Sequence, residues 1–231
     1  LLMVLQLIIP YATFAAAVGE FTSVFGNVTQ ARTNEVIRPV AKSSIELKDL
    51  IATDRASATA MVFSDDSTIM LSENTKLEIE EFLFKGKSRR GIFSLAVGKL
   101  MVNVKKYIGG DNVFEVYSPT AAVGVRGTGF EFVEAIKEGN IGSNSANQRM
   151  ATVSCTEGSL NLSAFSATGA IISTAVLEAG QVAVIIGGVI TISAIAAIAA
   201  AAIAKTAESG AAGAAGGAGT GTSGTAAAGG G

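Results

Sequence analysis

The densest group of charged side chains in the sequence is a basic run, Lys85-Gly86-Lys87-Ser88-Arg89-Arg90. Cationic groups spaced this closely can bind anionic lipid headgroups or the carboxylates of an acidic protein partner. Few aromatic side chains accompany the run and the net charge of the chain is -2, which argues against a nucleic acid as the partner. Lys85, Lys87, Arg89 and Arg90 are therefore candidates for a partner-binding patch, and a solvated loop is the alternative.

A further arginine, Arg126, lies between two glycines in Gly124-Val125-Arg126-Gly127-Thr128. Glycines permit backbone conformations or close approaches that a side chain would forbid. Arg126 can direct its donors to neighbouring carbonyl groups and a carboxylate, so we expect it to lock two coils of the fold together, with Thr128 bonding a turn. The alternative is that Arg126 holds an anion or a partner's carboxylate. A phosphate loop is disfavoured because no Lys-Ser/Thr pair opening a helix follows.

The residue types that are missing exclude most enzyme chemistry. The sequence contains no histidine and one cysteine, Cys155, so it cannot form a Ser-His-Asp triad, a Cys-His pair, a histidine-ligated zinc site or an intrachain disulfide. Cys155 follows an apolar alternation, which favours a buried thiol over a reactive or intermolecular one. Asp65 and Asp66 favour a solvated turn over a calcium site, which needs six or more oxygen ligands. We predict a non-enzymatic protein without a metal or cofactor.

The elements that position these residues have the periodicity of strands. Apolar residues alternate with polar ones, as in Lys76-Leu77-Glu78-Ile79-Glu80, and turn-forming residues such as Gly109-Gly110-Asp111-Asn112 separate the runs. No amphipathic helix stands between them. All but three of the charged residues lie between Glu20 and Glu157, which marks the folded part. The pattern predicts an all-β domain of short strands, either β-solenoid-like or a sandwich.

The amino terminus is apolar and uncharged. LLMVLQLIIP is followed by small residues at Ala15-Ala16-Ala17, which predicts that residues 1–17 are a signal peptide, with an uncleaved membrane anchor as the alternative. Because the chain begins at Leu1, we expect upstream residues to be missing. Either alternative exports the domain that follows.

The carboxyl terminus is also apolar. We predict an apolar, Ala-rich helix over residues 185–205, long enough to be a membrane segment, and a disordered Ala/Gly-rich tail over residues 206–231. A last strand ending at Ile185, followed by a turn at Gly187-Gly188, is an alternative for the start of this region.

Residues 18–184 resemble the FecR family in the order of several short motifs. The stretches that carry the resemblance are Gly26-Asn27-Val28, Leu47 to Thr53, Ala60 to Ile69, Ser94 to Leu100, Phe114 to Phe130, Val153 to Leu160 and Leu177 to Gln181. The most specific of them, FEVYSPTAAVGVRGTGF, resembles the family signature and contains Pro119, Gly124, Val125, Arg126, Gly127 and Thr128. Lys48 and Asp66 replace glycines of the family pattern, and Ser118 replaces a threonine.

The resemblance implies an extracytoplasmic domain that senses the state of an outer-membrane transporter and passes it inward to a sigma factor. We expect an exported FecR-like domain, in the periplasm, on the outer surface or anchored in the membrane facing outward. It would act in protein or ligand binding and signalling at the cell envelope, with an envelope protein, itself or the membrane as partner. The alternative is a structural subunit of a surface layer or an extracellular filament, whose Ala/Gly-rich end packs against its neighbours.

Overall fold

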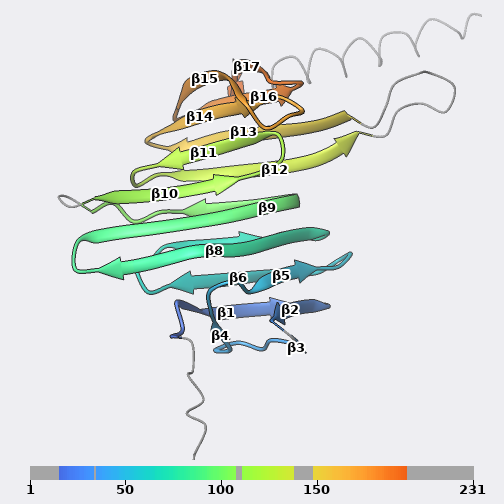
Figure 1. Ribbon diagram of the computed structural model, residues 1–231, viewed down its shortest axis with the longest axis vertical. Helices are drawn as coiled ribbons and strands as arrows, with labels where there is room; N and C mark the ends of the chain where they lie inside the picture. The colour runs from blue at the N-terminus through green and yellow to red at the C-terminus, as the bar shows by residue number, and fades with distance from the viewer. Residues whose placement is uncertain (1–15, 34, 108–110, 138–147, 197–231) are drawn as a thin grey trace, which may run out of the picture. The chain divides into compact units, whose positions relative to one another are not determined.

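The computed structural model describes residues 16–33, 35–107, 111–137 and 148–196. Residues up to Ser193 form one compact unit, built from strands and turns in the part described, and residues 194–231 belong to a second. The strands form two sheets, here called sheet A and sheet B. From one end of the unit to the other, the strands follow one another in approximate chain order from β1 to β16 (Figure 1). The all-β prediction is confirmed, and the described sheets are open.

Sheet A is antiparallel throughout. Its strand order is β4 (Ser44–Ile45), β1 (Gly19–Phe25), β6 (Ala58–Phe63), β7 (Thr68–Leu71), β9 (Ser88–Asn103), β12 (Gly129–Lys137), β13 (Gln148–Glu157) and β16 (Gln181–Ile186).

Sheet B contains a parallel pair, β9 with β10, among antiparallel neighbours. Its strand order is β3 (Glu35–Ile37), β2 (Val28–Arg32), β5 (Leu50–Thr53), β8 (Thr75–Lys85), β9, β10 (Asn112–Tyr117), β11 (Ala121–Val125), β14 (Ser159–Phe165) and β15 (Ile171–Glu178).

Strand β9 belongs to both sheets. Its first half pairs with β8 and β10 in sheet B, and its second half pairs with β7 and β12 in sheet A. The change takes place around Gly98, whose φ of 105° is in the region that favours glycine. A Cβ there would lie 2.7 Å from the Asn74 carbonyl oxygen, so the crossing also needs the missing side chain.

The core lies between the two sheets, as the period-two pattern predicts. Leu77 and Ile79 are fully buried, as are Phe130 and Phe132. Phe63 of sheet A packs against aromatic rings of sheet B, with centroids 5.0 Å from Phe82 and 5.2 Å from Phe93. Such aromatic pairs add to the free energy gained by burying the rings. Cys155 is also fully buried, and burial raises the pKa of its thiol, which confirms the buried-thiol prediction.

The prediction of an apolar helix from residue 185 is wrong for its first part. Strand β16 reaches Ile186, and β17 follows over Val189–Ala194. Gly187 and Gly188 both have positive φ and supply the turn between them. The β-branched residues that follow the turn favour a strand over a helix. The rest of the predicted helix beyond residue 196, the tail and residues 1–15 of the predicted signal peptide lie outside the described residues. Within the described residues, no helix is long and apolar enough to cross a membrane.

Candidate functional site

The glycine-flanked arginine lies where the chain passes from sheet B to sheet A. Gly124 and Val125 end β11, and the next three residues connect it to β12. Gly127 has a φ of 102°, and a Cβ there would lie 2.7 Å from the Lys106 Cα atom, whereas the nearest atom to a Cβ on Gly124 is 3.9 Å away. Gly127 is therefore required by the backbone, and Gly124 is not.

Arg126 lies at the surface of this crossing. Its side chain is exposed and forms no hydrogen bond or ion pair with another residue of the described ranges. The described residues therefore supply no partner for the structural role expected of Arg126, and that role stays a prediction. Thr128 is buried, and its backbone carbonyl accepts a hydrogen bond from Val104 N at 2.9 Å, but its hydroxyl bonds no turn among the described residues.

The arginine that joins the sheets is Arg89, a member of the predicted basic patch. Its side chain is fully buried, and Nη1 donates to Asp65 Oδ2 at 2.8 Å, to Ser67 Oγ at 3.3 Å and to the Lys105 carbonyl at 3.0 Å. The guanidinium carbon lies 5.5 Å from the centre of the Phe114 ring. Asp65, expected in a solvated turn, is buried because it neutralises this charge.

The other members of the basic patch are exposed around the β8–β9 hairpin. Lys85 and Lys87 flank Gly86 at its tip. Arg90 is half exposed and pairs with Glu81 at 2.8 Å, and the hydrogen bond to that carboxylate raises the pKa of Arg90. The structure therefore brings three of the four predicted cations together at the surface and separates Arg89 from them.

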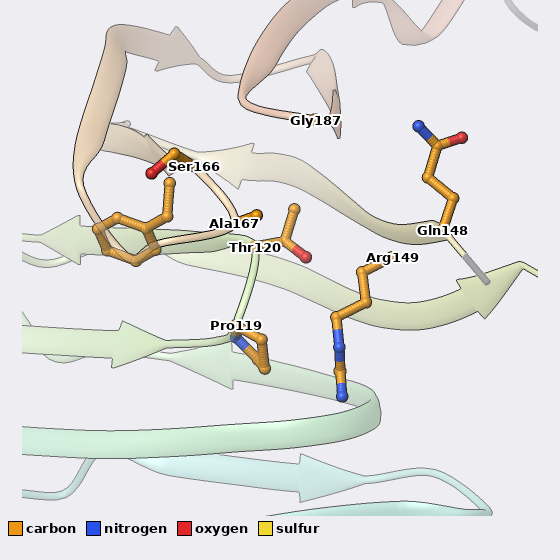
Figure 2. Close-up of a pocket in the computed structure, with 8 residues that line it drawn as sticks. Pro119, Thr120, Gln148, Arg149, Ser166, Ala167 and Gly187 are labelled. Atoms are coloured by element: carbon orange, nitrogen blue, oxygen red, sulfur yellow. The ribbon is translucent and has the colours of Figure 1, made fainter. Parts of the chain in front are cut away.

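A pocket of about 420 Å³ opens beside the turn between β10 and β11, within the signature. Pro119, which is exposed, and Thr120 form one wall, and Gln148 and Arg149 at the start of β13 form another (Figure 2). Gln148 and Arg149 point in opposite directions from the strand in this view. The remaining lining residues are Phe165, Ser166, Ala167 and Gly187. We call this cavity the signature pocket.

A buried carboxylate adjoins the signature pocket. Glu134 of β12 is 1% exposed, and its Oε1 accepts a hydrogen bond from Thr120 Oγ1 at 2.8 Å. Arg149 Nη1 lies 3.5 Å from the same oxygen, while Oε2 has no hydrogen-bond partner within the described part of the chain. Burial raises the pKa of Glu134 above its ordinary value, against the hydrogen bond from Thr120.

Comparison with known proteins supplies the identity of this framework. Residues 49–161 match the model of the FecR protein family, a range that includes both the buried Asp65–Arg89 pair and the glycine-flanked arginine. This part of the chain belongs to the FecR family. No curated protein matches the chain.

Two solved structures are similar to this chain. Both are crystal structures, at 1.65 Å and 2.50 Å resolution, of a "putative anti-sigma factor" from Parabacteroides distasonis. Each is 18% identical, with a TM-score of 0.47, over 63% of this chain and 59% of the other. The chain thus spans less than two thirds of the length of these structures.

Both departures from the glycines of the FecR pattern keep the backbone conformation that glycine favours. Lys48 has a φ of 66° and Asp66 a φ of 61°. The residues beside them carry the contacts of each turn, since Asp49 and Asp65 both accept hydrogen bonds from buried or half-buried donors. The expected turn geometry is therefore present in spite of the substitutions.

Three polar residues next to the signature pocket were not singled out from the sequence: Thr120, Glu134 and Arg149. One signal was available for Glu134, which continues the inward-facing alternation of Phe130 and Phe132 on β12. A carboxylate at a position that the strand pattern assigns to the core needs a buried partner. No group of three or more metal-ligating side chains occurs in the described ranges.

Proposed function

We propose that this FecR domain is a non-enzymatic interaction and signalling module of the cell envelope, which binds a segment of a protein partner in the signature pocket. The observation that carries the proposal is the position of the pocket. It is bordered by the β10–β11 turn within the family signature and by Arg149, a cation that remains 44% exposed. Concave sites with a few convergent polar groups are the usual form of binding sites.

The lining of the signature pocket fits a peptide better than a reaction. Pro119, Phe165 and Ala167 supply apolar surface, and Thr120, Ser166 and Arg149 supply hydrogen-bonding groups. Glu134 cannot act as an exposed base because its side chain is fully buried. A carbonyl or carboxylate of a bound segment could accept hydrogen bonds from the guanidinium of Arg149.

The extracytoplasmic location is part of the proposal and is supported by the apolar residues 1–17 of the sequence. In the FecR family such a domain senses a transporter of the outer membrane and signals to a sigma factor. We propose a transducing role of this kind, with an envelope protein as the partner.

Cell fractionation with site-specific photo-crosslinking tests this function. A photoreactive residue replaces Gln148 at the pocket rim of the full-length tagged protein, and the control carries it at Lys76, which is exposed elsewhere on β8. We expect an extracytoplasmic protein whose Gln148 position crosslinks to one envelope protein, while the Lys76 position does not. A cytosolic protein, or equal crosslinking from both positions, contradicts the proposal.

Self-association into a surface layer or filament is a second candidate, favoured by exposed apolar side chains on the last strands. Ile171 is 61% exposed, Val176 55% and Val189 66%. Exposed apolar residues on neighbouring strands are typical of surfaces that other chains cover. Sedimentation of the purified protein decides between the candidates: concentration-dependent polymers favour the filament, and a monomer at all concentrations eliminates it.

A further inference from the structure

A second concave surface lies on the outside of sheet B, next to the tip of the β8–β9 hairpin. It has a volume of about 260 Å³, and we call it the hairpin groove. The residues that line it are Leu83, Lys85, Ser88, Arg89, Arg90, Asp111 and Val113. They come from three adjacent strands or their ends, so the backbone of the sheet fixes their spacing.

The register of these strands places an apolar residue on each side of a cation. Leu83 lies opposite Arg90 in the β8–β9 pair, and Val113 lies beside Arg90 in the β9–β10 pair. Leu83 is 61% exposed although its strand is otherwise charged on its outer face. Cross-strand neighbours of this kind are close enough to bind one side chain together. The groove therefore offers apolar contact within reach of positive charge.

The charge of the hairpin groove is only partly neutralised by the protein. Asp65 pairs with the buried Arg89, and Glu81 pairs with Arg90. Lys85 lines the groove and is exposed, and it forms no ion pair with another described residue. Lys87, at the hairpin tip, is also exposed and forms no ion pair with another described residue. Asp111 is the carboxylate that remains on the opposite wall.

Beneath the groove, the guanidinium of Arg89 has donors to spare. Its Nη1 makes the three hydrogen bonds described above, whereas Nε and Nη2 are buried and have no hydrogen-bond partner among the residues described. Because Asp65 neutralises Arg89, the positive charge of the groove that no described carboxylate pairs comes from Lys85 and the adjacent Lys87.

We propose that the hairpin groove binds an acidic peptide segment of a partner protein. One carboxylate of the segment pairs with Lys85 and Lys87, and a neighbouring apolar side chain lies between Leu83 and Val113. Charge complementarity of this kind selects the partner and speeds encounter. The groove is concave and places an apolar slot beside cations. This shape suits a peptide with an acidic and an apolar side chain better than it suits the flat surface of a lipid bilayer. The site is separate from the signature pocket and does not depend on it, because the two share no lining residue.

Fluorescence anisotropy with a labelled peptide of alternating Glu and Leu, added to the full-length protein, tests the proposal. The matched peptide has Gln in place of every Glu. We expect binding of the Glu peptide alone, with affinity falling as salt rises from about 50 to about 300 mM because ion pairs at the surface are screened.

Variants assign the binding to the groove. Lys85→Glu combined with Lys87→Glu should lower the affinity for the Glu peptide by at least about tenfold. Leu83→Ser should lower it by a few-fold. Asp111→Asn should raise the affinity for the Glu peptide, because the substitution removes a carboxylate that repels the peptide. Lys76→Glu is the matched control, an exposed lysine of the same strand that is outside the groove, and should leave the affinity unchanged.

Three outcomes overturn the proposal. They are equal affinity for the Glu and Gln peptides, equal loss in Lys76→Glu and in the double variant, and binding to vesicles of anionic phosphatidylglycerol with no binding to the peptide. The last outcome would assign the cations to a membrane surface. Far-ultraviolet circular dichroism of each variant, matched to the parent protein, shows that any loss is not caused by unfolding.

Discussion

Arg89 Nη1 lies 2.8 Å from Asp65 Oδ2, and both side chains are fully buried, so this pair ties the β6–β7 turn of sheet A to the sheet B half of β9. Asp65 also accepts hydrogen bonds from the amide and hydroxyl of Ser67, at 3.0 and 2.7 Å. Tyr107 OH donates to the Asp65 carbonyl at 2.7 Å. The pair therefore holds both a turn and the junction between sheets.

Removing one partner of this pair should be severely destabilising. Asp65→Asn keeps the size of the side chain but leaves the Arg89 charge buried without a counter-charge, which typically costs about 3–5 kcal/mol. Urea denaturation measures the loss. Asp66→Asn is the control, since Asp66 is the neighbouring residue with a side chain that is 67% exposed, and it should change stability little. Similar losses in the two variants would show that the turn, rather than the buried pair, determines stability.

Arg126→Ala should leave the melting temperature nearly unchanged. The side chain is exposed and has no hydrogen bond or ion pair to other described residues, and substitutions of that kind usually change stability by no more than about 0.5 kcal/mol. Thermal denaturation followed by circular dichroism measures this. A large fall in melting temperature would restore the structural role that the sequence favours. Unchanged melting with weaker capture of a partner would leave the other alternative, a partner carboxylate held by Arg126.

The two signature glycines should respond differently to the same substitution. Gly127→Ala places a Cβ against the Lys106 backbone and forces a positive φ on alanine, so we expect a loss of at least about 1–2 kcal/mol. Gly124→Ala has room and lies within a strand, so it should be neutral or slightly stabilising. Equal losses in urea denaturation would contradict the assignment of the backbone requirement to Gly127.

The sequence predicts the strands well because burial repeats every second residue. Leu77 and Ile79 lie in the core for that reason, and the family signature is recognisable without any structure. The partners of charged residues are less predictable. Arg89 and Arg90 are adjacent in a basic run, yet strand alternation buries one and exposes the other.

Pairing between distant segments explains the other errors. Asp65 and Arg89 are 24 residues apart, and only the β6–β7 and β8–β9 connections bring them together. The pocket beside Thr120 likewise needs β13, and its neighbour Glu134 is 14 residues from Thr120. At the carboxyl end, local apolar composition suits a helix, but the Gly187-Gly188 turn and the β-branched residues after it favour another strand.

Asp49 should contribute stability that is lost in acid. Burial acts to raise the pKa of its carboxyl, but hydrogen bonds from Arg32, the Glu46 amide and Gln30 outweigh burial and lower it below the ordinary 3.8. A lowered folded-state pKa gives stability that is present above the unfolded pKa and lost as pH falls through the folded value. Asp49→Asn should therefore cost on the order of 2 kcal/mol at pH near 7. Its difference from the parent protein should shrink below pH of about 4.

The measurement is urea denaturation of both proteins across that pH range, with Asp54→Asn as the control. The Asp54 carboxylate accepts a hydrogen bond from Asn27 at an exposed position, so no buried network depends on its charge. A difference between Asp49→Asn and the parent that stays constant from neutral pH to pH of about 3 would show that the charge of Asp49 is not what stabilises the turn.

The contribution of Glu134 to stability should change with pH in the opposite direction to that of Asp49. Burial raises the pKa of its carboxyl above the ordinary 4.5, so the folded protein binds the proton more tightly than the unfolded chain does. The stability from that proton is fully present below the unfolded pKa and is lost as pH rises through the folded value. Glu134→Gln removes this dependence while leaving an oxygen to accept from Thr120. The variant should therefore gain stability relative to the parent protein as pH rises from about 4 to about 7. The prediction is wrong if the difference in stability between Glu134→Gln and the parent protein is constant over that range, or if the variant becomes less stable relative to the parent as pH rises. Either result would show that Glu134 is stabilised as an anion, with Arg149 as a stronger partner than the 3.5 Å separation indicates.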